Sequence, residues 1–109
     1  MEIIKKSGEF TKGEVFNMTQ GNPDKVSEHK GEVMELDGWV LYEDENSKGQ
    51  TQRVLALREK NGYISATISN TFINQFLKIV EFMGDEEYNI RVVGGTSKNG
   101  REYITCEVA

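Results

Sequence analysis

The fold is decided by residues 61–84, NGYISATISNTFINQFLKIVEFMG, which run from a turn through a strand into a helix. The pair Asn61-Gly62 is typical of a two-residue hairpin turn, because both positions tolerate positive φ. Alternation after this turn predicts a returning strand over 63–68. We expect the apolar side chains of this strand to face the core, while Tyr63, Ser65 and its other polar side chains face outward.

A helix is predicted directly after this strand. Ser69 can cap it, since a serine oxygen accepts a hydrogen bond from the free backbone N–H groups of a first turn. Gly84 is typical of a helix end. The apolar residues between them recur at intervals of three or four: Phe72, Phe76, Ile79, Val80 and Met83. This single stripe predicts a helix of about fifteen residues with one buried face.

Four further strands are predicted outside this central stretch. They cover residues 34–42, 51–58, 88–92 and 103–108, where apolar and polar residues alternate. Gly38 lies where the alternation of the first strand slips by one residue. Such a slip at a glycine indicates a bulge or a bend.

The order of elements is that of the five-stranded OB-fold Greek-key barrel, a mainly β class with its helix between strands 3 and 4. In that fold the loops after strands 1 and 4 flank an open face. These loops are residues 43–50 and 94–100. Residues 1–30 are interpreted as an N-terminal extension packing on the OB-fold domain of residues 31–109. An α+β roll that pairs the same elements differently is the alternative.

Composition indicates a single cytoplasmic domain. The 109 residues suit one hydrophobic core. The chain begins without the apolar run of a signal peptide, and no stretch approaches the roughly 20 apolar residues of a membrane span. Cys106 is the lone cysteine, so no intramolecular disulfide is expected. The net charge of -5 disfavours indiscriminate binding to polyanions.

Motifs for catalysis are missing, so we expect no enzyme and no cofactor. The sequence has one His, one Cys, and no phosphate-loop or zinc-protease pattern. His29 lies in a polar segment and is interpreted as a solvated linker residue, and Cys106 as a buried packing thiol. The acidic runs 43–45 and 85–87 lack the spacing of a calcium loop, so no metal site is predicted.

Aromatic and basic residues gather on the strands and loops around the predicted open face. Proteins that bind single strands stack bases on aromatic rings, at about 1 to 3 kcal/mol per base, and place cations near phosphates. The cation candidates are Lys48, Arg53, Arg58, Lys98 and Arg101, and the candidate platforms are Trp39, Tyr63 and Tyr103. Trp39 fits a core position equally well, because the bulge at Gly38 can turn it inward.

Three segments carry a family resemblance: GWVLYED at 38–44, SNTFINQF at 69–76 and GTSKNGREYITC at 95–106. On these segments the chain resembles the small single-stranded DNA-binding proteins encoded by tailed bacteriophages, particularly those infecting Gram-positive bacteria. The resemblance covers roughly the last two thirds of the chain. It implies an OB fold that coats single-stranded DNA during phage replication, without sequence preference or catalysis, in the host cytoplasm.

The resemblance also bears on the partners of the protein, and the acidic charge leaves another function open. Bacterial relatives recruit replication proteins through an acidic, glycine-rich tail, and the chain stops at Glu107-Val108-Ala109, so recruitment by such a tail is not expected. Monomer and homodimer both stay open. A module that docks on a host or replication protein through its acidic surface is the main alternative function. A nuclease on the same barrel would need acids clustered around a metal, and no such cluster stands out.

Overall fold

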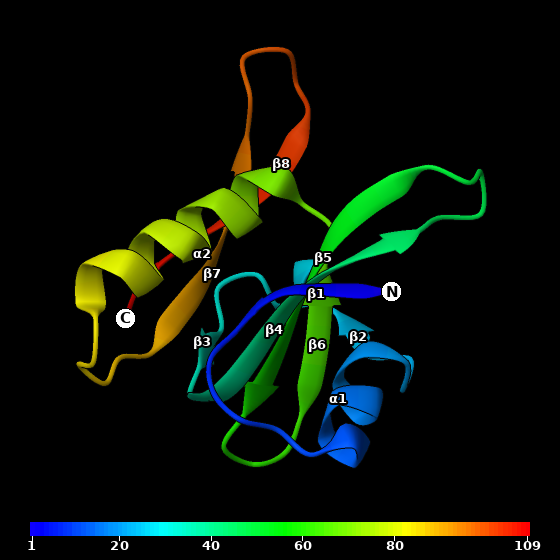
Figure 1. The fold of residues 1–109 in the computed structure, drawn as a ribbon. Helices are drawn as coiled ribbons and strands as arrows, with labels where there is room; N and C mark the ends of the chain where they lie inside the picture. Colours follow the sequence, from blue (N-terminus) through cyan, green and yellow to red (C-terminus); the bar gives the residue numbers. More distant parts are fainter.

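Strands dominate the computed structural model, which describes all of residues 1–109 (Figure 1). The strands are β1 (Glu2–Lys6), β2 (Asp24–Lys25), β3 (Val33–Met34), β4 (Leu36–Glu45), β5 (Thr51–Glu59), β6 (Ile64–Thr67), β7 (Ile90–Thr96) and β8 (Glu102–Val108). The helices are α1 (Lys12–Thr19), α2 (Asn70–Met83) and a short 3-10 helix, η1 (Val26–His29).

The central stretch forms a turn, a strand and a helix in the predicted order. Gly62 has a φ of +89° in the turn between β5 and β6, a conformation that glycine adopts without strain. The Ser69 hydroxyl accepts a hydrogen bond from the backbone N–H of Phe72 at 3.2 Å, which caps α2. The helix ends at Gly84, whose N–H donates to the carbonyl of Val80. The predicted helix is therefore confirmed. The turn lies at the predicted place but has three residues, 60–62, because Glu59 pairs with Tyr63, and of the pair Asn61-Gly62 only the glycine has a positive φ.

The strands form two sheets. One has the order β1-β4-β5-β6-β2 and the other has the order β3-β7-β8. The first long strand of the prediction is divided at Glu35, so that β3 pairs with β7 and β4 pairs with β5. Register shifts between Leu36 and Gly38, which confirms the predicted bulge. No ladder joins β6 to β8, so the sheets are not closed into the barrel that the sequence predicts.

The main core lies between α2 and the two sheets. Its largest fully buried side chains include Phe72 and Phe76 of α2, which pack toward residues of β4, β5, β7 and β8. Trp39 belongs to this core, in contrast to its predicted use as a stacking platform. It is 7% exposed and meets the Phe76 ring edge to face, with the centroids 5.6 Å apart. The bulge at Gly38 turned the indole inward, the alternative that the sequence left open.

A second, smaller core covers the opposite face of the large sheet. It consists of Met18 from α1 with Val40, Tyr42, Val54 and Ala56 from β4 and β5. The extension builds this layer, because it contributes α1 and also the two edge strands β1 and β2 (Figure 1). Residues 1–30 thus contribute two edge strands to the sheet and a helix that packs on its face.

This second layer overturns the predicted facing of β6. Ser65, expected outward, is 1% exposed and pairs with Leu57 beside the main core. Ile64 and Ala66 pack instead against the smaller core. Alternation predicts a core face only where the other face meets water, and here both faces are covered.

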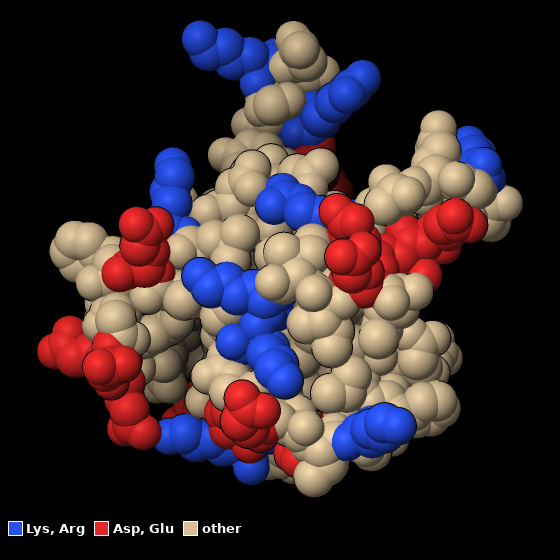
Figure 2. Space-filling model, viewed as in Figure 1, with Lys and Arg blue, Asp and Glu red and all other residues tan.

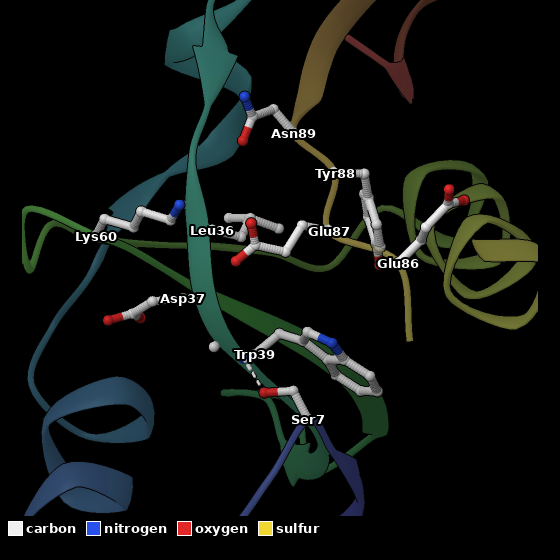
Figure 3. Close-up of a pocket in the computed structure, with 10 residues that line it drawn as sticks. Ser7, Leu36, Asp37, Trp39, Lys60, Glu86, Glu87, Tyr88 and Asn89 are labelled. Carbon is white, nitrogen blue, oxygen red and sulfur yellow. Dashed lines mark hydrogen bonds between the residues drawn. The ribbon is translucent and has the colours of Figure 1, made fainter. Parts of the chain in front are cut away.

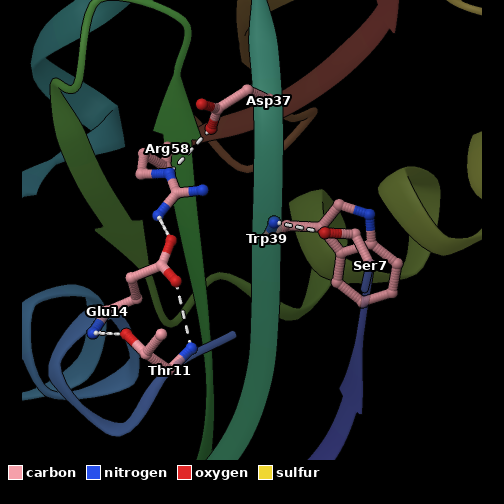
Figure 4. A network of polar contacts seen from close by, with 6 residues as sticks. All are labelled: Ser7, Thr11, Glu14, Asp37, Trp39 and Arg58. Atoms are coloured by element: carbon pink, nitrogen blue, oxygen red, sulfur yellow. Dashed lines mark hydrogen bonds and ion pairs between the residues drawn. The ribbon is translucent and has the colours of Figure 1, made fainter. Parts of the chain in front are cut away.

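An arginine clamp joins the extension to the sheet (Figure 4). Arg58 donates to Glu14 of α1 and to Asp37 of β4, at 2.8 Å each, and its guanidinium lies over the Phe10 ring. Glu14 also accepts from the backbone N–H of Thr11, and this bond together with Arg58 lowers the pKa of the Glu14 carboxyl. Arg58, predicted to meet phosphates, is therefore engaged by two carboxylates inside the fold.

Candidate nucleic-acid interface

Two hairpins project from the same end of the molecule (Figure 1). The β4–β5 hairpin turns through residues 46–50, where the Asn46 side-chain oxygen accepts from the backbone N–H groups of Lys48 and Gln50. Gly49 follows with a φ of +76°. This asparagine-built turn leaves Lys48 exposed at the tip.

The β7–β8 hairpin carries the larger share of cations. Its turn is closed by Ser97, whose hydroxyl accepts from the backbone N–H of Arg101, and by Gly100 with a φ of +78°. Lys98 and Arg101 are exposed in this turn. Figure 2 shows basic side chains at the tips of both hairpins, with acidic side chains at the base of the β4–β5 hairpin.

Tyr103 lies across the β7–β8 hairpin on top of Gly95, its cross-strand partner. A methyl group built on Gly95 would overlap the hydroxyl end of the Tyr103 ring. Only a glycine therefore lets the ring lie this close to the neighbouring backbone. Tyr103 is 42% exposed, so one side of the ring rests on the strand while the rest stays open to solvent.

Arg53 is oriented by two asparagines of α2. Its guanidinium donates to the side-chain oxygens of Asn70 and Asn74, at 3.0 and 2.9 Å. These residues lie one helical turn apart, so both amides face β5. Arg53 forms no ion pair with a carboxylate, although Glu43 lies opposite it in the ladder. Its positive charge is thus held in place without being neutralised.

Tyr63 lies near the other end of the sheet in a polar network. Its hydroxyl donates to Asp24, and His29 contacts the same hydroxyl at 3.0 Å and Glu32 at 2.9 Å. The hydrogen bond to Asp24, with smaller contributions from burial and nearby carboxylates, raises the pKa of Tyr63 to about 12. Tyr63 therefore ties η1 and β2 to the start of β6, and its hydroxyl is already occupied.

We expect this tyrosine to make stability fall as the pH rises from about 10 to 12. The unfolded chain loses the phenolic proton near pH 10, whereas the folded chain keeps it to about 12, so rising pH favours unfolding in this window. Tyr63→Phe removes the ionisation, and its free energy of unfolding should fall less steeply there. Urea denaturation at several alkaline pH values measures both slopes. Parallel slopes would contradict the prediction.

The structure gathers five of the eight predicted site residues and separates the other three. Lys48, Arg53, Lys98, Arg101 and Tyr103 lie on the two hairpins or at their base. Arg58, Tyr63 and Trp39 lie toward the opposite end of the sheet; Arg53 and Arg58 are five positions apart along β5, about 17 Å at the usual rise per residue. Sequence reasoning missed Asn70, Asn74 and Gly95.

The described residues include no group of three or more His, Cys, Asp or Glu side chains that could hold a metal ion. None of the helices has both the length and the apolar character needed to cross a bilayer. Cys106, as predicted, is a buried thiol, and burial raises its pKa to about 12.

Comparison with known proteins bears on this interface. A family model described as phage single-stranded DNA-binding protein, of the phi29 type, matches residues 5–109. Searches of curated proteins and of solved structures gave no match. The matched residues span nearly the whole chain, including the extension, both hairpins and α2. This chain therefore belongs to the phi29-type family of phage single-stranded DNA-binding proteins.

Proposed function

We propose that the protein binds single-stranded DNA during phage DNA replication, without base sequence preference, through the end that carries the two hairpins. Membership of the family supports single-stranded DNA as the ligand. The observation that carries the binding mode is Tyr103 resting on Gly95, because it leaves an aromatic ring presented beside unpaired cations. We assign no catalytic step to the chain and place it in the host cytoplasm.

The charge distribution favours closer phosphate contacts at the β7–β8 hairpin than at the β4–β5 hairpin. The β4–β5 hairpin offers Lys48 but also carries the acidic run Glu43 to Glu45. The β7–β8 turn offers Lys98 and Arg101 without an acid inside the turn. We assign the closest phosphate contacts to Lys98, Arg101 and Arg53, and a peripheral contact to Lys48. Cations close to the DNA affect binding more than the net charge of -5 does, because salt screens the interaction between exposed charges more than about 10 Å apart.

The strand pairing supports an open relative of the OB fold. If β3 and β4 are counted together as the first strand of the five, the neighbours are those of the five-stranded Greek key. The pairs are β6 with β5, β5 with β4, β3 with β7 and β7 with β8. The missing link is the closing pair between β6 and β8. In this interpretation the two hairpins are the loops that flank the OB binding face.

A titration with fluorescein-labelled oligo-dT tests the proposed function. Probe anisotropy is measured at several salt concentrations, and the logarithm of the affinity is expected to fall linearly with the logarithm of salt concentration. A slope of about -0.7 per neutralised phosphate counts the contacts. Oligo-dC of equal length should bind with similar affinity. Absence of binding at low salt would overturn the proposal.

Gly95→Ala is expected to weaken oligo-dT binding about tenfold, which is within the range of one stacked base. The added methyl group meets only the far end of the Tyr103 ring, so the ring swings away while the fold persists. Thermal unfolding should therefore stay within about 2 °C of the parent chain. Gly8→Ala is the matched control, since a methyl group there meets nothing within 4 Å. Equal affinity of the two variants would remove Tyr103 from the interface.

A further inference from the structure

The start of β4 has an open edge. β5 pairs with β4 from Leu36 onward, but β1 reaches the other edge only at Val40, and the Ser7 N–H extends this pairing to the carbonyl of Trp39. β7 pairs with β3 no further along than Met34. Residues 35–38 thus have a strand neighbour on one side only. Such an edge is able to pair with a further extended segment.

A pocket of about 580 Å³ lies against this edge (Figure 3). One wall is the start of β4, with Leu36 and Trp39, and the opposite wall is the connection from α2 to β7, with Glu86, Glu87 and Tyr88. The pocket therefore combines a strand edge, two aromatic side chains and a carboxylate rim. We call it the edge pocket.

The indole of Trp39 leaves an unused donor in the edge pocket. Its ring is buried, with 7% of the residue exposed, and the indole nitrogen faces the side where Tyr88 lies (Figure 3). The backbone N–H of Trp39 donates to the Ser7 hydroxyl, but the indole N–H has no acceptor within the protein. Although Trp39 as a whole is buried, this nitrogen is not closed off from the pocket, so it is free to donate to an acceptor on a molecule bound there.

The rim of the edge pocket is negative. Glu86 and Glu87 are exposed and form no ion pair, and Asp37 pairs with Arg58. Lys60 is the one basic residue of the lining. Phosphates are repelled by such a rim, whereas an ammonium or guanidinium group is attracted and also gains from the nearby aromatic rings. The charge favours a cationic peptide over a nucleic acid.

We propose that the edge pocket binds a short extended segment of a partner protein that carries a lysine or arginine. The segment pairs with the open edge of residues 35–38, offers a backbone carbonyl to the indole N–H of Trp39, and places its cation between Glu86 and Glu87. The pocket lies at the start of β4 and β7, whereas the hairpins lie at their far ends. DNA and this partner are therefore able to bind at the same time.

A fluorescein-labelled tetrapeptide, acetyl-Val-Arg-Val-Arg-amide, tests the proposal on the full chain. Its anisotropy should rise saturably, and the emission of Trp39, the single tryptophan, should change over the same concentration range. The amide resonances of residues 35–38 should shift and gain protection from exchange. Acetyl-Val-Gln-Val-Gln-amide should bind about tenfold more weakly, because it lacks the cations.

Two double variants distinguish binding in the edge pocket from attraction of the peptide by the overall negative charge of the protein. Glu86→Gln with Glu87→Gln should weaken the arginine peptide about tenfold, whereas Glu43→Gln with Glu45→Gln, which removes the same charge at the other end of β4, should not. Equal losses in both variants, or a peptide that leaves Trp39 and residues 35–38 unchanged, would overturn the proposal. The Glu86/Glu87 variant should retain its affinity for oligo-dT, so failure here and failure of DNA binding are separate results.

Discussion

Replacing Arg53, Lys98 and Arg101 together by alanine is expected to weaken binding to oligo-dT about 100-fold at moderate salt. Each of these cations is exposed or half-buried and lacks a carboxylate partner, so each is free to neutralise a phosphate. Loss of three contacts should also reduce the salt slope by about 2, since single strands contribute about 0.7 per phosphate. Fluorescence anisotropy at four or more salt concentrations measures both quantities.

The matched control removes the same charge elsewhere. Lys12, Lys25 and Lys78 are exposed on α1, β2 and α2, away from the hairpins, and their triple alanine variant has the same net charge as the test variant. We expect its salt slope to match that of the parent chain. If both triple variants lose affinity and slope equally, overall charge determines binding and the hairpin end is not the site.

Arg58→Met is expected to lower the free energy of unfolding by about 2 to 3 kcal/mol. Arg58 makes two charge-assisted hydrogen bonds, to Glu14 and Asp37, and its guanidinium lies over Phe10. Methionine keeps the apolar stem but loses these contacts, so α1 is held less firmly on the sheet. Chemical denaturation at pH 7 measures the loss, and the melting temperature should fall by about 10 °C.

Arg91→Ala is the appropriate comparison for this clamp. Arg91 pairs with Glu107 at 3.3 Å on an exposed face, where an ion pair contributes at most about 1 kcal/mol. Arg58→Met should leave the salt slope of oligo-dT binding unchanged, because its guanidinium is already engaged within the protein. A reduced slope with normal stability would return Arg58 to the DNA interface.

Local signals in the sequence predicted the elements that depend on near neighbours. Asn61-Gly62, Ser69 and Gly84 act within four residues of their own position, and the turn and helix that they predict are present. The pairing of β1 with β4 joins Glu2 to Glu43, and no local pattern reports such a partner. The second core was missed for the same reason, since Met18 becomes buried only when α1 folds back on the sheet.

The candidate interface shows the same division. Exposed cations in turns were predictable, because turn residues at Asn46 to Gln50 and Ser97 to Arg101 place Lys48, Lys98 and Arg101 in solvent. The packing of Tyr103 on Gly95 was not predictable, because it depends on which residue of β7 lies opposite Tyr103 in the ladder. A paired glycine in β7 opposite an aromatic in β8 is the signal that could have found it, once the register of the last hairpin was assumed.

The place of β1 has a consequence for the order in which the chain can fold during synthesis. β1 is synthesised before its only ladder partner, β4, and the paired residues of the two strands lie 34 to 41 positions apart. The β4–β5 hairpin, by contrast, closes through a short turn as soon as both its strands have emerged. The amino-terminal strand therefore waits unpaired and docks onto a sheet that is already forming. Until it arrives, the edge of β4 is open along Val40 to Glu43 and is able to pair with a strand of another nascent chain.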